Sequence, residues 1–348
     1  MSPPAPNLTP SLAQRLAAAD RRLRRLCLGL GALVALLFCL SLAIGPAPLA
    51  LFGDLTGTGE QAALARAILL EIRLPRAALG LLIGAALGLS GAALQGLLRN
   101  PLAEPGLIGI SATAALGAVA VFYFGLAGAF ALALPLGGLA GAAAAVTLLY
   151  GLAGREASAL TLILAGVAVT SLAGALTALA LNLAPSDYAA LEIVFWLLGA
   201  LTDRSMTHLW LAGPFILAGC GLLLATARPL EALALGEDTA RSLGVSLPRL
   251  RALAIGGTAL AVGASVSVSG AIGFVGLIVP HLLRPLIGHR PAHLLPASAL
   301  GGAALVQAAD IAVRLIPTAQ ELKLGVLTAL IGAPFFLHLL RQTRRAMR

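Results

Sequence analysis

The sequence predicts an all-α, polytopic membrane protein with about ten transmembrane helices. Hydrophobic residues make up 59% of the 348 residues, whereas charged residues make up only 11%. A soluble domain carries about 25% charged residues, and a single apolar core stops growing near about 250–300 residues. The mean hydropathy of +0.98 therefore indicates that lipid is the solvent for most of the chain.

Ten apolar segments approach the roughly 20 residues that a helix needs to cross a bilayer. Gly80, Gly84 and Gly88 repeat every four residues, and such a stripe of small side chains lets a neighbouring helix approach closely. The pattern lacks the two-residue alternation of a membrane β-barrel, so we expect a compact helical bundle. The predicted spans are 26–45, 74–96, 106–126, 130–150, 160–182, 207–227, 251–269, 271–287, 294–313 and 323–340.

The distribution of charge predicts the orientation of these spans. An even number of spans places both termini on one side, and most of the 23 basic residues fall on that side. An excess of Lys and Arg marks the cytoplasmic side of a membrane protein. This bias also explains the net charge of +9, so no nucleic-acid partner is expected. The predicted regions are a basic cytoplasmic tail over 1–25, a transmembrane domain over 26–340 and a basic cytoplasmic tail over 341–348.

A weak internal repeat relates the two halves of the chain. The tripeptide Ser-Gly-Ala at 90–92 recurs at 269–271, and Pro101 and Pro280 match at the same offset. The copies begin in the second and seventh predicted spans, and an odd separation gives them opposite orientations. This arrangement predicts an inverted repeat of the kind found in transporters. Chance matching in a Gly- and Ala-rich sequence is the alternative.

A short exposed helix is predicted in the cytoplasmic loop over about 228–250. Glu237 lies four residues before Arg241, a spacing that supports a helix, and the order of the charges suits the helix dipole. Gly244 is placed as a C-cap. Such a helix suits docking of a soluble partner, although a merely solvated loop is the alternative. The residues assigned to this element are Leu235, Gly236, Glu237, Asp238, Arg241, Leu243 and Gly244.

Three arginines fall on the outer side, against the prevailing charge bias: Arg73, Arg76 and Arg314. Arginines at span ends commonly extend to the membrane interface, which is one interpretation. The other is a set of exposed cations that bind carboxylates of an external protein. Asp310 lies four residues before Arg314, so a pair within one helix is also expected.

The chain shows no energy source of its own. It contains no Gly-rich phosphate loop of the Gly-x-x-x-x-Gly-Lys-Ser/Thr type, and Lys323 is its only lysine. Few ionisable residues lie within the predicted spans, so the chain lacks an obvious proton relay. A transporter built from this chain would therefore depend on a separate nucleotide-hydrolysing partner.

An intramembrane serine protease is the alternative from another functional class. Residues 88–91 read Gly-Leu-Ser-Gly, with Ser90 as a candidate nucleophile and His281 as a candidate base. In a chain with 40 glycines this tetrapeptide more often serves helix packing. No catalytic residue and no metal site are therefore assigned. The histidines at 208, 281, 289, 293 and 338 suggest haem ligation only weakly, as ionisable groups near a membrane.

Several motifs stand out in order along residues 45 to 345. They are Arg73-Leu74-Pro75-Arg76, Ser90-Gly91-Ala92 with Gln95, Arg99 to Gly106, Leu235 to Gly244, Gly270 to His281, Ala309-Asp310 and Gly325 to Phe336. Together they resemble the permease subunits of ABC importers for iron chelates, haem and cobalamin, the FecCD-type family. The resemblance implies a type II importer fold, a homodimer with its pathway at the dimer interface, and a bacterial inner-membrane location.

The resemblance also implies partners and roles. Two cytoplasmic ATP-binding subunits would use ATP and Mg, and a periplasmic binding protein would deliver cargo for import by alternating access. Arg73, Arg76 and Arg314 match the family's docking residues, and the segment 235–244 matches its coupling helix. The family's cytoplasmic gate matches Ser158, Ala159, Leu160 and Thr161, although Ala159 and Leu160 replace the small hydroxyl residues of some members.

The residues of these motifs most resemble those of the family's haem-uptake branch. Haem is therefore the expected cargo, with a ferric siderophore or cobalamin as the alternative, and no cofactor is expected to stay bound to this chain. Lys323 departs from the family pattern, because it stands where a proline commonly follows the Glu-Leu pair.

Overall fold

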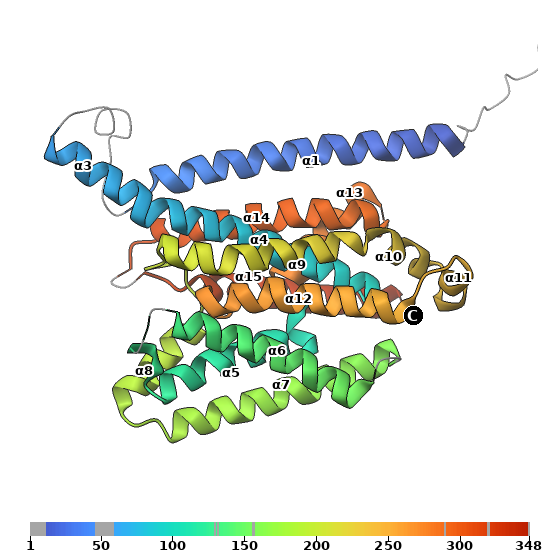
Figure 1. Cartoon of the computed structure of the whole chain (residues 1–348). Coiled ribbons are helices and arrows are strands. Elements are labelled where there is room, and N and C mark those ends of the chain that lie inside the picture. Colours follow the sequence, from blue (N-terminus) through green and yellow to red (C-terminus); the bar gives the residue numbers. More distant parts are fainter. Residues whose placement is uncertain are drawn as a thin grey trace, which may run out of the picture.

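The computed structural model of the chain describes residues 12–45, 59–128, 130, 132–154, 157–288, 290–318 and 321–346, and within these ranges it contains helices and no strands. The helices lie side by side in one elongated bundle (Figure 1). The elements are α1 (Leu12–Ala43), α3 (Glu60–Ala67), η1 (Ile68–Arg73), α4 (Leu74–Leu97), η2 (Pro105–Ile108), α5 (Ile110–Tyr123), η3 (Leu126–Gly128), α6 (Ala133–Ala153), α7 (Ala159–Asn182), α8 (Asp187–Leu197), α9 (Met206–Ala225), α10 (Ala227–Ala234), α11 (Glu237–Ser242), α12 (Leu247–Ser269), α13 (Val275–Ile287), α14 (Pro291–Leu315) and α15 (Leu324–Ala346).

The predicted number of spans agrees with this architecture. In the described residues, 8 helices are long and apolar enough to cross a membrane, and two shorter apolar helices, α5 and α13, occupy the remaining predicted positions. The second span is longer than predicted, because α3, the π-helical η1 and α4 continue without a break from Glu60 to Leu97. The helix α8 was not predicted as a separate element, since its 11 residues are too few to cross a bilayer.

The helix α4 is the centre of the bundle, with α9, α12, α13 and α14 packed around it. The predicted glycine stripe makes its closest contact, because a methyl group on Gly84 or Gly88 would overlap the backbone carbonyl of Gly302 or Ser298 on α14. Without side chains at these positions, the two backbones approach to direct contact. The stripe therefore fixes the position of α14 against α4.

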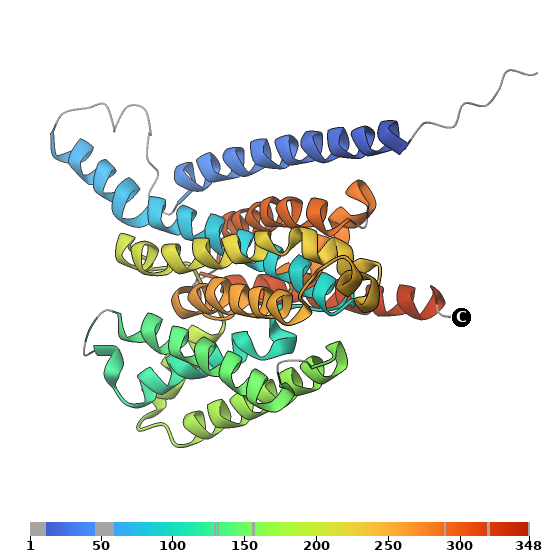
Figure 2. The same cartoon turned by 45° about the vertical axis from the view of Figure 1, so that its right-hand side comes forward.

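The two copies of the predicted repeat run in opposite directions. The helix α4 ends beside α10, where Gly96 contacts Leu230, and α12 begins beside α11, where Arg251 pairs with Glu237. The end of α12 lies at the opposite end of the bundle, where Ala200 N donates to Ser269 O at 2.7 Å. Figures 1 and 2 show the two helices side by side and antiparallel.

The predicted tails are largely helical. The helix α1 begins at Leu12, so the boundary predicted at residue 25 falls inside it, and α15 continues to Ala346. The start of α1 is rich in Ala, Leu and Arg, which have high helix propensity, so the helix extends beyond its apolar part. Residues 1–11 of the predicted N-terminal tail lie outside the described residues.

Candidate functional sites at the two ends of the bundle

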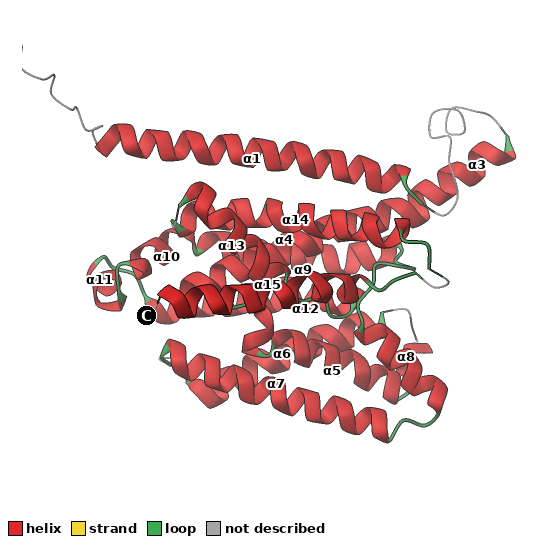
Figure 3. Ribbon diagram, turned by 180° about the vertical axis from the view of Figure 1, so that it is seen from behind, coloured by secondary structure: helices red, strands yellow, loops and turns green. Residues whose placement is uncertain are grey.

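The predicted site residues gather at two opposite ends of the bundle. One end, called here the α11 end, holds α11, the start of α1, the end of α15 and the start of α7 (Figure 3). The other, called the η1 end, holds η1, α8 and the end of α1. Both described ends of the chain therefore lie at the α11 end, as the even number of spans predicted.

Arg76 is the centre of a buried ion-pair network at the η1 end. Its Nε and Nη2 atoms donate to Asp310 Oδ1 at 3.0 and 2.8 Å, and its guanidinium also pairs with Glu321. Arg314 binds the same Asp310, with 2.9 Å between Nη2 and Oδ2. Asp310 thus pairs with two arginines and links α4 to α14, and its side chain is only 1% exposed.

Arg73 and Arg314 also hold the C-terminal end of α1. Arg73 Nη1 donates to the carbonyl oxygens of Leu42 and Ala43, each at 2.8 Å. Arg314 donates to the carbonyl and hydroxyl oxygens of Ser41, at 2.9 and 2.6 Å. The last carbonyl groups of a helix lack partners within it, so the two guanidinium groups complete the hydrogen bonding of α1 and attach it to the bundle.

This arrangement corrects the expectation that the three arginines are exposed cations. Arg73 and Arg76 are 4% and 8% exposed, and the Arg314 side chain is 3% exposed. The pair between Arg314 and Asp310, expected from their spacing, is present. The reason for the difference is that each of these arginines also has a partner in a distant part of the chain, which charge counting along the sequence does not reveal.

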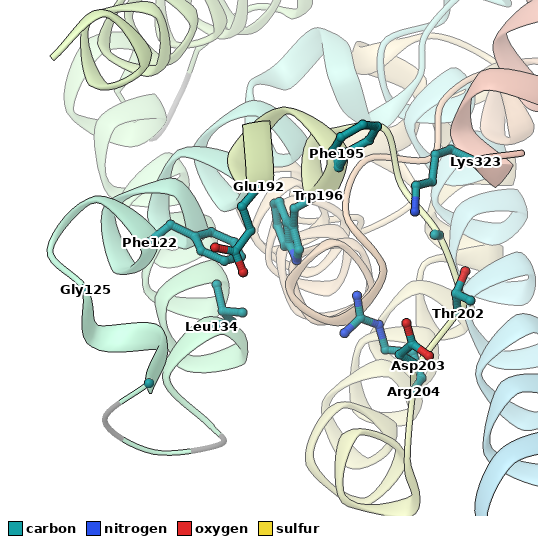
Figure 4. Close-up of a pocket in the computed structure, with 12 residues that line it drawn as sticks. Phe122, Gly125, Leu134, Glu192, Phe195, Trp196, Thr202, Asp203, Arg204 and Lys323 are labelled. Carbon is teal, nitrogen blue, oxygen red and sulfur yellow. The ribbon is translucent and has the colours of Figure 1, made fainter. Parts of the chain in front are cut away.

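A pocket of about 630 Å³ lies at the same end, between α8, the connection from α5 to α6 and the segment before α9. Phe122 and Trp196 meet edge to face in its wall, with 6.2 Å between ring centroids. Lys323 Nζ lies 6.0 Å from the centroid of the Phe195 ring. Figure 4 shows the Arg204 guanidinium and the Lys323 ammonium projecting into the pocket from different segments.

Arg204 has no hydrogen-bond partner for its buried Nε atom among the described residues. Burial lowers the pKa of its guanidinium, and the neighbouring Asp203 carboxylate opposes that shift. Glu192 and Asp203 also line the pocket. The site thus combines aromatic walls with two cations and two carboxylates, and sequence reasoning did not identify it because its residues come from four separate segments.

At the other end, α11 has the predicted form of a short capped helix. It covers Glu237–Ser242, and Gly244 follows it in the left-handed conformation, with φ +81°. Arg241 pairs with Glu237 at 3.6 Å, and Glu237 also pairs with Arg251 of α12 at 3.5 Å. Leu235 and Leu243, which flank α11, are 67% and 62% exposed.

Residues 158–161 form the start of α7. Ser158 is its N-cap, because Ser158 Oγ accepts a hydrogen bond from Thr161 N at 3.1 Å. Such caps satisfy one of the unpaired amide groups of the first turn. Ala159 lines a small cavity together with Glu237 and Arg251. The first turn of α7 therefore lies against the base of α11. The neighbouring turn at 99–106 packs on α7 as well, since Thr170 Oγ1 donates to Gly106 O at 3.2 Å.

The serine of the candidate protease motif lies in the helix-packing interface. Ser90 is fully buried, and its Oγ has no hydrogen-bond partner among the described residues. Gly88 and Gly91 on either side contact backbone carbonyls of α14 and α13. The histidine proposed as its base, His281, packs against Phe335, with 5.7 Å between ring centroids. The motif thus has a packing role.

The described histidines do not form a metal-binding group. Within the residues that the structure describes, no group of three His, Cys, Asp or Glu side chains could hold a metal ion. His208 Nδ1 accepts from Ser205 N at 3.2 Å and caps α9, and His293 Nε2 lies 3.2 Å from Asp20 Oδ1. His289 lies outside the described residues.

Comparison with known proteins identifies the family. A model described as the FecCD transport family matches residues 33–342. The cobalamin import system permease protein BtuC of Halobacterium salinarum is 42% identical over 285 residues, which cover 80% of this chain and 74% of that protein. The hemin transport system permease protein HmuU of Yersinia pestis is 39% identical over 283 residues, which cover 80% and 84%.

A solved structure shows the same fold. It is an inward-facing conformation of a transporter described as being of the metal-chelate ABC type, 32% identical, with a TM-score of 0.80 over 92% of this chain and 99% of that one. The relatives are ABC permease subunits, in which a separate ATPase hydrolyses ATP, so the protease alternative is wrong. With an inverted helical repeat and a fold shared with that structure, the chain belongs to the FecCD transport family.

Proposed function

We propose that this chain imports haem, or a related iron chelate, from a periplasmic binding protein into the cytoplasm by alternating access. It would work as a homodimer in the bacterial inner membrane, with both termini cytoplasmic and two ATP-binding subunits at the α11 end. The exposed helix α11 carries this proposal, because it is a short helix at that end with an exposed leucine on either side.

The contacts of α11 support its role in coupling. Leu235 and Leu243 are 67% and 62% exposed and would enter a groove of the ATP-binding subunit. Glu237 connects α11 to Arg251, and the cavity lined by both residues also includes Ala159. A shift of α11 would therefore reach residues 158–161, which supports the proposed gate at the start of α7.

The coupling proposal is tested with a double variant, Leu235→Glu and Leu243→Glu. In proteoliposomes containing the ATP-binding subunits and the binding protein, ATP-driven uptake should fall by at least tenfold, because two carboxylates would replace the apolar contact. The control is Glu60→Gln near the η1 end, which changes an exposed charged residue far from α11 and should leave uptake unchanged. Full uptake by the double variant would contradict the proposal.

We also propose that the binding protein docks at the η1 end. Because the arginines there are buried and paired, docking would require one of them to exchange its carboxylate partner. Glu321 is the more exposed partner of Arg76, with 25% of its side chain exposed against 1% for Asp310. A carboxylate of the binding protein would displace Glu321 from Arg76 while Asp310 stays in place. Charged partners of this kind exchange at modest cost when one of them is near water.

Glu321→Gln tests this exchange. Removing the competing charge should strengthen binding of the cargo-loaded binding protein several-fold, as measured by surface plasmon resonance on the permease in nanodiscs. Arg76→Gln should weaken the same binding. Unchanged affinity in both variants would remove Arg76 from the docking site.

Haem as cargo is supported by the pocket at the η1 end and by the hemin permease among the relatives. Aromatic walls suit a planar porphyrin, and Arg204 and Lys323 suit its two carboxylates. Ferric siderophore or cobalamin import is the second candidate, because a cobalamin permease is equally similar. Uptake of haemin, a ferric siderophore and cobalamin by the same proteoliposomes separates them, and uptake of cobalamin without haemin would overturn the haem assignment.

A further inference from the structure

A strongly basic cavity lies at the α11 end, away from the coupling helix. It has a volume of about 610 Å³ and is lined by Arg21, Arg22 and Arg25 from the start of α1, together with Ile287 and Gly288 at the end of α13. All three arginines are exposed. Among the described residues no Asp or Glu lines this cavity, and its charged side chains are all arginines.

The described part of the chain does not neutralise this charge. No ion pair links Arg21, Arg22 or Arg25 to any described carboxylate, and the nearest acid in sequence, Asp20, lies 3.2 Å from His293 instead. Residues 1–11, which precede α1 outside the described residues, contain no Asp or Glu. An anionic ligand can therefore bind these arginines without breaking an ion pair among the described residues.

The surroundings of the cavity indicate which molecule that is. The same helix continues directly into apolar side chains that face outward, with Leu28 66% exposed and Leu36 56% exposed. On the other wall, Leu286 beside Ile287 is 48% exposed. A ligand with an anionic head and apolar chains would contact both parts at once. A guanidinium group can donate two parallel hydrogen bonds to the oxygens of one phosphate. Basic pockets between membrane helices bind anionic lipid headgroups.

We propose that this cavity binds the headgroup of an anionic phospholipid. The phosphate would lie among Arg21, Arg22 and Arg25, and the acyl chains would lie along the exposed leucines of α1 and α13. The lipid would fill the space between the start of α1 and the end of α13. The proposal concerns membrane contact only and is independent of the cargo and of the coupling mechanism.

The fourth arginine of the cluster provides a matched comparison. Arg24 is exposed on the same helix but does not line the cavity. The test compares the triple variant R21Q/R22Q/R25Q with the control triple R24Q/R228Q/R249Q, which removes the same charge from the same end of the molecule. Each protein is purified in mild detergent, and its retained phospholipid is measured by native mass spectrometry.

We expect the wild type and the control triple to retain phosphatidylglycerol or cardiolipin. The cavity triple should retain at least tenfold less of these lipids than the wild type. In nanodiscs, anionic lipid should raise the melting temperature of the first two proteins and not of the cavity triple. Equal lipid loss in both triples would overturn the proposal, because a general attraction to the membrane surface would then suffice.

Two further outcomes would also overturn it. If inorganic phosphate at millimolar concentration stabilises the wild type as strongly as anionic lipid does, the site binds a free anion. If the cavity triple keeps its lipid but loses the ATP-binding subunits, the cavity binds an acidic protein surface. A triple variant that fails to accumulate is replaced by Arg22→Gln, compared with Arg24→Gln.

Discussion

The two ends of the bundle use charge in opposite ways. At the η1 end, the side chains of Arg76 and Asp310 are 10% and 1% exposed, and each has further charged partners. At the α11 end, the side chains of Arg241 and Asp238 are 60% and 99% exposed and 3.3 Å apart. The comparison teaches that charge near a span end can hold helices together or keep a partner-facing surface in water, and that only burial distinguishes the two.

The largest expected effect comes from breaking the buried network. Asp310→Asn removes the negative charge that Arg76 and Arg314 share. Removing one partner of a buried ion pair costs about 3–5 kcal/mol. We expect the free energy of unfolding in detergent to fall by about this amount. The matched variant at the other end is Asp238→Asn, for which we expect a change of less than about 0.5 kcal/mol. Similar losses in both variants would show that burial does not separate the two ends.

Sequence reasoning predicted the parts of this picture that depend on local pattern. The ten spans follow from apolar length, the contact of α4 with α14 from the glycine stripe, and α11 from charges and a capping glycine within ten residues. The pair between Arg314 and Asp310 was predicted from its spacing, whereas the contacts of Arg76 were missed because Arg76 meets Asp310 and Glu321 across 234 and 245 residues of sequence. The pocket at the η1 end was missed for the same reason, and α8 was missed because it is shorter than a span.

A smaller effect is expected from the bond that attaches α1. Ser41→Ala removes the hydroxyl that accepts from Arg314 Nη2 at 2.6 Å, and a hydrogen bond to a charged group contributes about 1.5–3 kcal/mol. We expect faster hydrogen exchange in the C-terminal half of α1. Ser242→Ala is the control, because that exposed hydroxyl donates to Asp238 O at the α11 end and should contribute less than about 0.5 kcal/mol. Unchanged exchange around Ser41 would argue against a fixed α1.

The next smaller effect is expected for the ion pair between Arg251 and Glu237, which is partly buried, with side chains 9% and 39% exposed. Arg251→Gln should lower the free energy of unfolding by about 1 kcal/mol, because a partly buried ion pair is lost. Since this pair connects α11 to α12, the ratio of transported cargo to hydrolysed ATP should also fall. A variant with normal coupling would show that α11 acts through other contacts.

The smallest expected effect separates stability from partner binding. Arg241→Ala removes two exposed ion pairs, at 3.6 and 3.3 Å, and exposed pairs contribute about 0–1 kcal/mol. We therefore expect the melting temperature to fall by no more than about 2–4 °C, the shift that about 1 kcal/mol produces in a chain of this size. Association with the ATP-binding subunits should nevertheless weaken measurably, because the surface that α11 presents has changed. If stability fell while association stayed constant, α11 would belong to the packed bundle and the contrast between the two ends would disappear.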